Sequence, residues 1–423
     1  MAVLLNRRLE LSFATPGVTS GFIIKSENII AESMVITRSL CDGNFKLGGC
    51  IASSFEIQLI DVPANKVQGK KITALLYETF EIYGAQSVIF PSTSIYPAND
   101  LYPGKHFTRE RMRHLFAGTV DTAKRQNDRQ IVKITAYDDL YTLGNKNVYT
   151  WFYNFALHSP DGKITDLTSS LFSSQLSELQ LNGNPYGSNG NDQMALKLSA
   201  AAVKKKFYKE GLLAIDVLRS ICELTGGFGY IDEEGKFLVV DIKNNLSHPY
   251  TRSISRYESL SFEEYETQMF DGMVLCYGDD KKFIYGRATS FAQGSCYYCK
   301  DNVLANCCTD DATASNFGKN LANKQSSGLL YNKPSSGLLY EDYCYRPFAL
   351  KMDDDFSSID DPTQICTTLG VKVKIATGFN SSDDIQYVNS FVLKERITGI
   401  ANLTHEFSAE GEKVQTGYDS EAI

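Results

Sequence analysis

Residues 54–59 read Ser-Phe-Glu-Ile-Gln-Leu, a stretch in which polar and apolar side chains alternate one by one. Successive side chains of a β-strand point to opposite faces of the sheet, so this alternation predicts a strand with one buried face. Residues 130–137 alternate in the same way, with Val132, Ile134 and Ala136 on one side. Both stretches therefore favour β-sheet over helix for the first part of the chain.

The sequence around these two stretches carries further strand signals. Residues 28–40 alternate less regularly and are followed by an Asp-Gly pair at 42–43, which is typical of a turn. Residues 72–90 form an aromatic and β-branched run, the composition that strands favour. We therefore expect residues 1–145 to form one antiparallel β-barrel or sandwich.

Helical patterns begin in the middle of the chain. Residues 193–208 and 211–224 contain helix formers, and in the second segment apolar residues recur at the three- and four-residue steps that share a helix face. The glycine pair 226–227 is a suitable end for that helix, because glycine accepts a positive φ. Residues 228–240 then resemble a hairpin, so we expect an α+β insertion in residues 146–250.

The β pattern returns towards the C-terminus. Residues 273–277 are a short apolar run, and residues 387–407 supply two more predicted strands. Residues 371–375 read Val-Lys-Val-Lys-Ile, which predicts that the two valines and the isoleucine face a core while the lysines face outward. We therefore expect a second β-barrel in residues 251–423.

A polar segment at about residues 285–362 interrupts this second β region. It contains a tandem repeat, KQSSGLLYN at 324–332 followed by KPSSGLLYE at 333–341. A repeat architecture needs at least about three copies to bury a core, so two copies indicate a local duplication. The sequence therefore predicts a long surface loop, a feature that is often functional.

Composition narrows the class of protein. A chain of 423 residues exceeds the usual single core and predicts two to four domains. Hydrophobic residues make up 43% and charged residues 22%, which excludes a wholly disordered chain. The sequence has no uncharged apolar run of about 18 residues, the length that a membrane span needs, and no signal peptide.

The formal net charge is −8. A nucleic-acid-binding protein normally carries the opposite sign, because contacts with phosphate dominate its affinity. An acidic protein can still surround DNA if its task is to let the DNA pass. The charge therefore argues against a protein that recognises a nucleic-acid sequence, but it is compatible with a protein that forms a channel for DNA.

Motifs for catalysis are missing from the sequence. His405-Glu406 begins like a zincin helix motif, but Ala409 stands where the second histidine would be. No serine lies in a nucleophile elbow, and residues 187–190 (Gly-Ser-Asn-Gly) lack the lysine of a phosphate-binding loop. We therefore assign no catalytic residue, no cofactor and no metal, and expect a protein that is not an enzyme.

Two clusters leave alternatives open. Cys296, Cys299, Cys307 and Cys308 could bind zinc, could form disulfides after release from the cell, or could be unlinked thiols. The aspartates at 353–355 and 360–361 could bind calcium, but they lack the glycine and final glutamate of an EF-hand loop. An acidic loop exposed to solvent is the simpler interpretation of these aspartates.

Basic residues form two runs. One consists of Lys204, Lys205 and Lys206 with Lys197 and Lys209, and the other of Arg109, Arg111 and Arg113. Such runs are usually solvated surface, and in an acidic protein they could also dock an acidic neighbour. We expect both runs to face solvent or other proteins.

Four phrases of the sequence resemble a known family. They are IAESMVITRSLC (30–41) with KLGGCIASSF (46–55), KITAYDDL (133–140), LRSICELTGGFGYIDEEGKFL (218–238) and NSFVLKERITGIANLTHEFSAEGE (389–412). In this order they resemble the baseplate hub, or tail-associated hub, of long-tailed phages and prophages of Gram-positive bacteria. The fold of these hubs is shared with hubs of contractile injection systems.

The resemblance implies a fold and an assembly. The fold would be mainly β with an α+β insertion, with two tail-tube-like antiparallel β-barrels per chain, and the chain would assemble as a homotrimer. The protein would be a structural hub at the tail tip or baseplate, which joins the sixfold tail tube to the threefold tip and forms or closes the DNA channel. It would be a virion component, assembled in the cytoplasm of the bacterial host.

The resemblance also implies partners. These are the tail tube or distal tail protein, the tape measure protein and a central spike or fibre, while double-stranded DNA passes through without specific binding. Two other functions stay open at this point: a tail-associated cell-wall hydrolase, and a receptor- or glycan-binding tail module.

Overall fold

The computed structural model describes the following residues: 2–16, 21–41, 47–83, 106–126, 130–181, 194–241, 252–254, 258–262, 272–279, 281–286, 296–326, 343–344, 347–353, 369, 372–379, 385–400, 404–410 and 414–415.

The N-terminal strands form an antiparallel sheet in the order β3-β4-β7-β6-β5-β1-β2. Their bounds are β1 (Ala2–Ala14), β2 (Gly21–Ile24), β3 (Val35–Ser39), β4 (Ser54–Ile60), β5 (Lys71–Tyr83), β6 (His106–Arg125) and β7 (Ile131–Tyr137). Every second side chain along β4 and β7 is buried, which confirms the alternation that predicted these strands. Short helices η1 (Ser26–Asn28), η2 (Ala31–Ser33) and α1 (Ala64–Val67) lie in the connections.

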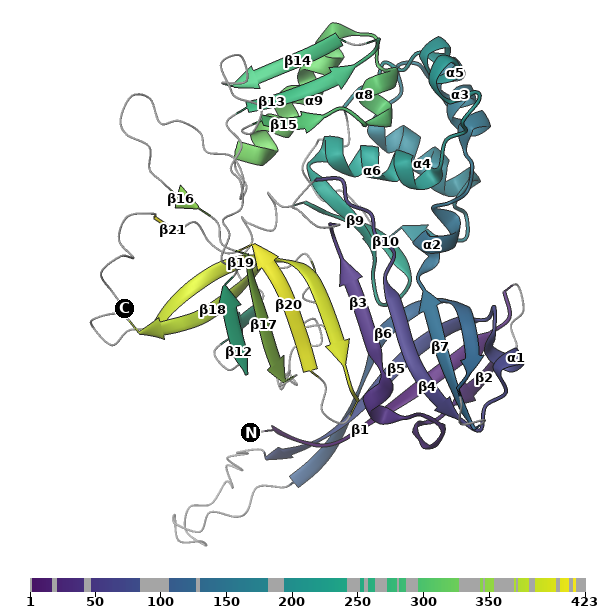
Figure 1. Cartoon of the computed structure of the whole chain (residues 1–423), viewed down its shortest axis with the longest axis vertical. Coiled ribbons are helices and arrows are strands. Elements are labelled where there is room, and N and C mark those ends of the chain that lie inside the picture. The colour runs from purple at the N-terminus through teal and green to yellow at the C-terminus, as the bar shows by residue number, and fades with distance from the viewer. Residues whose placement is uncertain are drawn as a thin grey trace, which may run out of the picture.

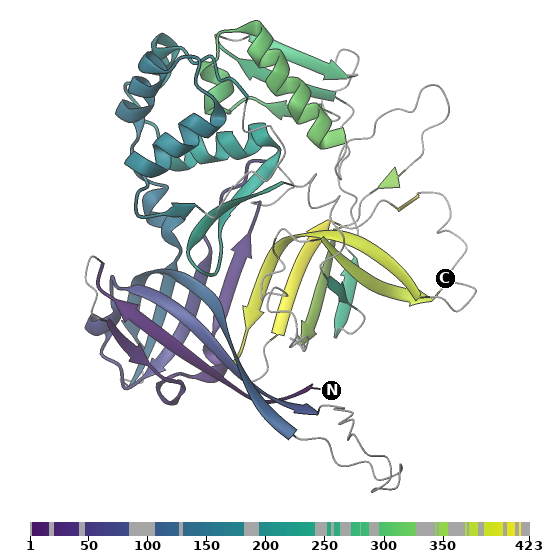
Figure 2. The same cartoon turned by 180° about the vertical axis from the view of Figure 1, so that it is seen from behind.

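The C-terminal strands continue the same sheet, which has 13 strands in all (Figures 1 and 2). Their bounds are β11 (Arg252–Ile254), β12 (Ser259–Phe262), β17 (Pro347–Asp353), β18 (Lys372–Phe379), β19 (Ile385–Thr398) and β20 (Thr404–Glu410). A separate pair consists of β16 (Tyr343–Cys344) and β21 (Val414–Gln415).

The long strand β19 connects the two halves of the sheet. One edge of β19 pairs with β20, and the other edge pairs first with β18 and then, at residues 394–398, with β3. Ile397 lies opposite Ile36, and both side chains are fully buried in the core of the N-terminal strands. Residues from the end of the chain therefore complete a core that begins near its start.

This pairing bears on the two barrels expected from the sequence. The mainly β architecture with additional helices is confirmed. In the described part of the chain the sheet is not closed into barrels, because β3 pairs with β19 and makes one sheet continuous across both halves. Two separate barrels are therefore not confirmed. Of the predicted 371–375 strand, residues 372–375 lie in β18, while residue 371 and the direction of these side chains lie outside the description.

An α+β body lies beside the sheet (Figure 1). Its first elements are α2 (Asp139–Leu143), α3 (Tyr149–His158), α4 (Ile164–Ser174), β8 (Gln180–Leu181), α5 (Ala200–Phe207), α6 (Ala214–Thr225), β9 (Gly227–Ile231) and β10 (Lys236–Asp241). Helix α6 is the central element and ends at Gly226, whose φ of 78° is left-handed as the glycine pair predicted. The predicted hairpin corresponds to β9 and β10.

Further elements of this body come from the strand predicted at residues 273–277, which corresponds to β13 (Gly272–Tyr277), and from the residues after it, which include part of the predicted long loop. β13, β14 (Lys281–Gly286) and β15 (Cys296–Cys299) form a small sheet, followed by α8 (Val303–Cys307) and α9 (Asp311–Ser326). Figure 2 shows α9 beside this sheet. The loop prediction is therefore wrong for residues 296–326, because Ala314, Phe317 and Leu321 recur at helical spacing and are fully buried among polar neighbours that face outward. Most of the tandem repeat lies outside the described residues.

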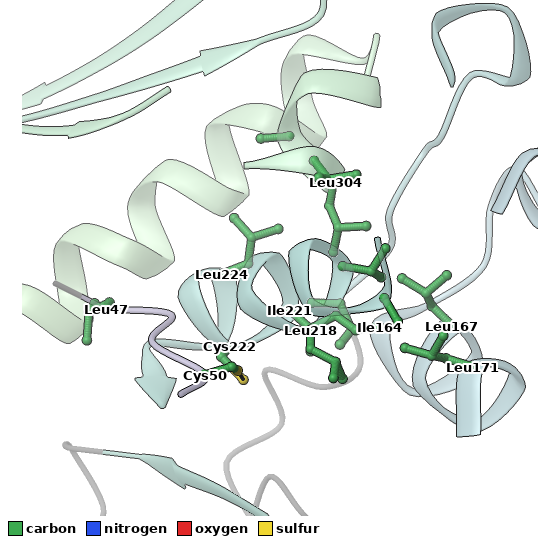
Figure 3. Close-up of a cluster of buried hydrophobic side chains, with 14 of the residues drawn as sticks. Leu47, Cys50, Ile164, Leu167, Leu171, Leu218, Ile221, Cys222, Leu224 and Leu304 are labelled. Atoms are coloured by element: carbon green, nitrogen blue, oxygen red, sulfur yellow. Dashed lines mark hydrogen bonds between the residues drawn. The ribbon is translucent and has the colours of Figure 1, made fainter. Parts of the chain in front are cut away.

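The core of the body extends into the connection between β3 and β4. Leu40, Leu47 and Cys50 belong to the same buried cluster as residues of α4, α6 and α8 (Figure 3). The chain thus leaves the sheet after β3, packs under α6 and returns to form β4. Sheet and body are therefore joined through this connection as well as through α2.

Candidate functional site

Arg38 lies at the junction between the sheet and the α+β body. Its Nη1 donates to Glu233 Oε1 at 2.9 Å and to Glu395 Oε2 at 3.5 Å, and its Nη2 donates to the carbonyl of Leu115. Arg38 and Glu395 are cross-strand partners on β3 and β19, while Glu233 comes from the turn between β9 and β10. We call Arg38, Glu233 and Glu395 the Arg38 junction.

The Arg38 junction is buried, and burial controls the protonation of Glu233. Arg38 and Glu395 are each 2% exposed. Removal from water, and to a smaller extent the charge of Glu395, raise the pKa of Glu233 to about 7 against the opposing effect of Arg38. Two carboxylates that share one guanidinium in a dry site favour a proton on one of them.

Three of the four family-like phrases meet at this junction. Arg38 belongs to the phrase 30–41, Glu233 to 218–238 and Glu395 to 389–412. The phrase 133–140 supplies Asp138, whose carboxylate accepts from the backbone N–H of Ser53 at 2.7 Å and of Leu140 at 3.0 Å, and caps α2. Burial raises the pKa of Asp138 to about 7.

A second buried charged cluster corrects the prediction for the arginine run. Glu78 on β5 is fully buried and accepts from Arg7 Nε at 3.1 Å, from Arg111 Nη2 at 2.7 Å and from Arg113 Nη2 at 2.8 Å. Arg7 and Arg111 are the direct cross-strand partners of Glu78. Arg111 and Arg113 were expected to face solvent or another protein, and they bind this carboxylate of the same chain instead. Arg109 is exposed as expected.

Part of the lysine run also binds within the chain. Lys205 pairs with Asp279 at 3.0 Å, and Lys206 donates to the Gly278 carbonyl at 2.9 Å, so α5 holds the turn between β13 and β14. Lys197 pairs with Asp161. Lys204 lies over the ring of Tyr208, at 6.0 Å from its centroid, and Tyr208 is 65% exposed. The exposed end of this run therefore combines an ammonium group with an aromatic ring.

A groove of about 830 Å³ opens between the β3–β4 connection, α6 and α8. Its lining includes Gly48, Cys50, Glu210, Asp216 and Asp301. In its wall the carboxylate of Glu223 accepts from Tyr297 Oη at 2.7 Å and from Asn302 Nδ2 at 2.9 Å. These bonds fix Glu223 as a structural acceptor. Burial, and to a smaller extent the charge of Glu223, raise the pKa of Tyr297.

The cysteine cluster predicted as a possible metal or disulfide site is a set of packed thiols where it is described. Cys299, Cys307 and Cys308 are buried, the last two as free thiols, and burial raises the pKa of Cys307 to about 12. In the described ranges no three His, Cys, Asp or Glu side chains are grouped suitably for a metal ion. Cys296 begins β15, but its side chain, the residues 187–190 and the aspartates after 353 lie outside the description.

The fold is similar to that of two tail proteins of known structure. No family model and no curated protein matches the sequence. A tail protein from Neisseria meningitidis aligns over 96% of both chains with a TM-score of 0.53 at 10% identity. The 43 kDa tail protein of prophage MuSo2 from Shewanella oneidensis aligns over 95% of this chain and 97% of that chain, with a TM-score of 0.50 at 10% identity. The chain therefore shares the fold of these tail proteins along nearly its whole length.

A third solved structure is more distant. A component of the type VI secretion system of E. coli aligns over 96% of this chain and 78% of that chain at 6% identity, but its TM-score of 0.37 is too low to support an argument. None of the described helices is long and apolar enough to cross a membrane.

Proposed function

We propose that this protein is a structural component of a phage tail, the hub at the tail tip or baseplate. The observation that carries the proposal is the fold that it shares, over 96% of its length, with a tail protein of matching size. The four family-like phrases support it independently, because three of them meet at the Arg38 junction and so serve one structural purpose. In this proposal the protein is not an enzyme and needs no cofactor.

The hub would be a homotrimer that adapts symmetry. Residues 1–145 and 251–423 would supply one tube-like unit each, with residues 146–250 inserted between them. The elements β13, β14, β15, α8 and α9 would pack on the insertion. Three chains would then present six similar units to a sixfold tail tube and keep threefold symmetry towards a tip. Rings of this kind close because the rotation between neighbouring copies closes.

The partners follow from that position in the virion. The sixfold face would bind the tail tube or a distal tail protein, the tape measure protein would end in the channel, and a central spike or fibre would occupy the threefold face. Assembly would take place in the host cytoplasm, and hosts among Gram-positive bacteria remain part of the proposal.

Mass measurement and electron microscopy of the purified protein test the assembly. Light scattering should give three times the chain mass of 47.1 kDa, and particles should be rings with threefold symmetry. The measurement should be repeated over a concentration series, because a hub can need a partner to close its ring. A stable dimer, or a closed ring of another symmetry, would show the trimer to be wrong.

The two other functions are tested with purified cell walls. Release of soluble wall fragments would support a hydrolase, and sedimentation with the walls without release would support a receptor- or glycan-binding module. A hub that acts only in tail structure should do neither.

A further inference from the structure

Cys50 and Cys222 come together in the core of the α+β body although they lie 172 positions apart in the sequence. Their sulfur atoms are 3.7 Å apart, and both residues are almost completely buried. Figure 3 shows the two side chains side by side, Cys222 from α6 and Cys50 from the connection between β3 and β4. Both thiols are free in this structure.

The backbone around Cys50 is held firmly against β9. The Gly48 N–H donates to the Gly227 carbonyl and the Gly229 N–H to the Gly49 carbonyl, each at 2.9 Å. Cys50 itself forms a parallel bridge with Gly229. A Cβ at Gly229 would lie 2.6 Å from the sulfur of Cys50 and 3.0 Å from that of Cys222. Glycine at 229 therefore leaves the space in which the two sulfurs meet.

Cys222 is fixed equally well, because it lies in the last turn of α6, where the Gly226 N–H caps the Cys222 carbonyl. A disulfide bond is about 2.05 Å long, so the two sulfurs must approach by roughly 1.7 Å to bond. For the bond to form, rotation of the two side chains must close this gap.

We propose that Cys50 and Cys222 are a site of intramolecular disulfide formation, oxidised by a small peroxide that enters through the groove. Cys50 lines that groove of about 830 Å³ and is the thiol that meets the oxidant. Cys222 does not line the groove, so it enters the reaction second. The hydrogen bond with Cys50 and burial both raise the pKa of the Cys222 thiol.

The chemistry proceeds in two steps. The sulfur of Cys50 attacks one oxygen of hydrogen peroxide, the O–O bond breaks, and the thiol proton leaves with the displaced hydroxide as one water, which gives a sulfenic acid at Cys50. The sulfur of Cys222 then attacks the Cys50 sulfur, the S–O bond breaks, and the thiol proton leaves with the hydroxide as a second water. Two thiols are oxidised and one peroxide is reduced.

The bond would tie the β3–β4 connection to the central helix. In the chain-entropy view, a link across a long loop restricts the unfolded chain more than a link across a short one. A protein that leaves a reducing cytosol would gain this link without a change of fold. The site itself does not depend on the tail assignment, since the reaction concerns the isolated chain.

The test uses the full-length protein, treated with hydrogen peroxide under native conditions, quenched with catalase, and alkylated in denaturant. Peptide mapping should find Cys50 joined to Cys222, with a mass loss of about 2 Da and two fewer alkylated cysteines. The melting temperature of the oxidised protein should rise by roughly 5 °C or more and return on reduction.

Three variants sharpen this test. Cys222→Ser and Cys50→Ser should abolish the linked peptide and the melting shift, while Cys276→Ser, at a partly exposed position on β13, should leave both unchanged. If one variant does not fold, the peptide map of the unmodified protein still shows whether Cys50 and Cys222 are linked. A sulfinic acid at Cys50 beside an alkylated Cys222, linkage only between other cysteines, or two thiols that stay reduced while Cys276 is oxidised would each overturn the proposal.

Discussion

At the scale of single residues, Glu78 is the carboxylate on which the long strands β1, β5 and β6 depend. It is fully buried and binds three arginines. Removing one member of a buried ion cluster leaves charges in a dry environment and typically costs about 3–5 kcal/mol. Glu78→Gln should therefore lower the free energy of unfolding by about that amount, measured by urea denaturation.

A matched control lies on the outward face of the same strands. Glu110 pairs with Arg8 at 2.8 Å, but its side chain is 48% exposed. Exposed pairs contribute about 1 kcal/mol or less, so Glu110→Gln should change stability little. Equal losses in the two variants would show that the Glu78 cluster is not a buried structural element.

Glu233 should give the protein a pH-dependent stability. Its pKa is raised from 4.5 to about 7, so the folded state binds this proton more strongly than the unfolded state does. Protonated Glu233 therefore contributes about 3 kcal/mol to the free energy of unfolding. This contribution is fully present below about pH 4.5 and is lost as the pH rises through about 7. Asp138, whose pKa is also about 7, acts in the same direction.

Glu233→Gln separates this contribution from the rest. Glutamine keeps an oxygen acceptor for Arg38 but carries no charge. The stability of the variant should therefore fall less between pH 5 and pH 8 than that of the unmodified protein. Melting temperatures of both proteins across this range provide the measurement. Glu234→Gln, at the exposed neighbouring position, is the control, and its curve should keep the slope of the unmodified protein. If the melting temperature of Glu233→Gln depends on pH as steeply as that of the unmodified protein, Glu233 is not the source of this pH dependence.

At the scale of elements, β19 links the core of the N-terminal strands to the end of the chain. Ile397 is fully buried in that core. Truncation of a buried isoleucine to alanine removes its contacts and leaves a cavity, at a cost of about 2–5 kcal/mol. Ile397→Ala should therefore destabilise the N-terminal strands in urea, whereas Lys394→Ala, at a half-buried position on the same strand, should cost much less.

Elements with a regular pattern were predictable from the sequence. The alternation at 54–59 corresponds to β4, and the helix and glycine pair that follow residue 211 correspond to α6 and Gly226. Helix α9 was missed because its apolar residues are few and stand among serine, asparagine and lysine. Its burial comes from packing against β13 and β14, which are themselves separated from it in the sequence.

The contacts between distant segments were not predictable. Arg38 lies 195 positions from Glu233 and 357 from Glu395, and no local pattern distinguishes these three residues from surface charges. The same holds for Glu78, because two of its three arginines, Arg111 and Arg113, were predicted as part of an exposed basic run. Only the register of β1, β5 and β6 reveals that one carboxylate faces them all.

At the scale of the whole molecule, the net charge bears on how strongly the proposed channel would bind DNA. A trimer carries three times −8, or −24. Strong binding to phosphate needs arginine and lysine groups that displace counterions, and several of these groups are already engaged. Arg111 and Arg113 bind Glu78, while Lys197 and Lys205 bind aspartates. Fewer cations therefore remain available to a passing duplex.

We accordingly expect a channel lined by Asp, Glu and neutral polar side chains, through which DNA passes without specific binding.

An electron microscopy map of the assembled ring would give the sign of the charges at its narrowest part, and fluorescence anisotropy with duplex DNA would give the affinity. Binding should be weak at about 50 mM salt and nearly absent at about 200 mM, because carboxylates repel the phosphate backbone and exposed lysines are screened. A narrow part lined mainly by lysine and arginine, together with strong binding at low salt that declines steeply as salt is added, would mean that the channel holds DNA rather than letting it pass.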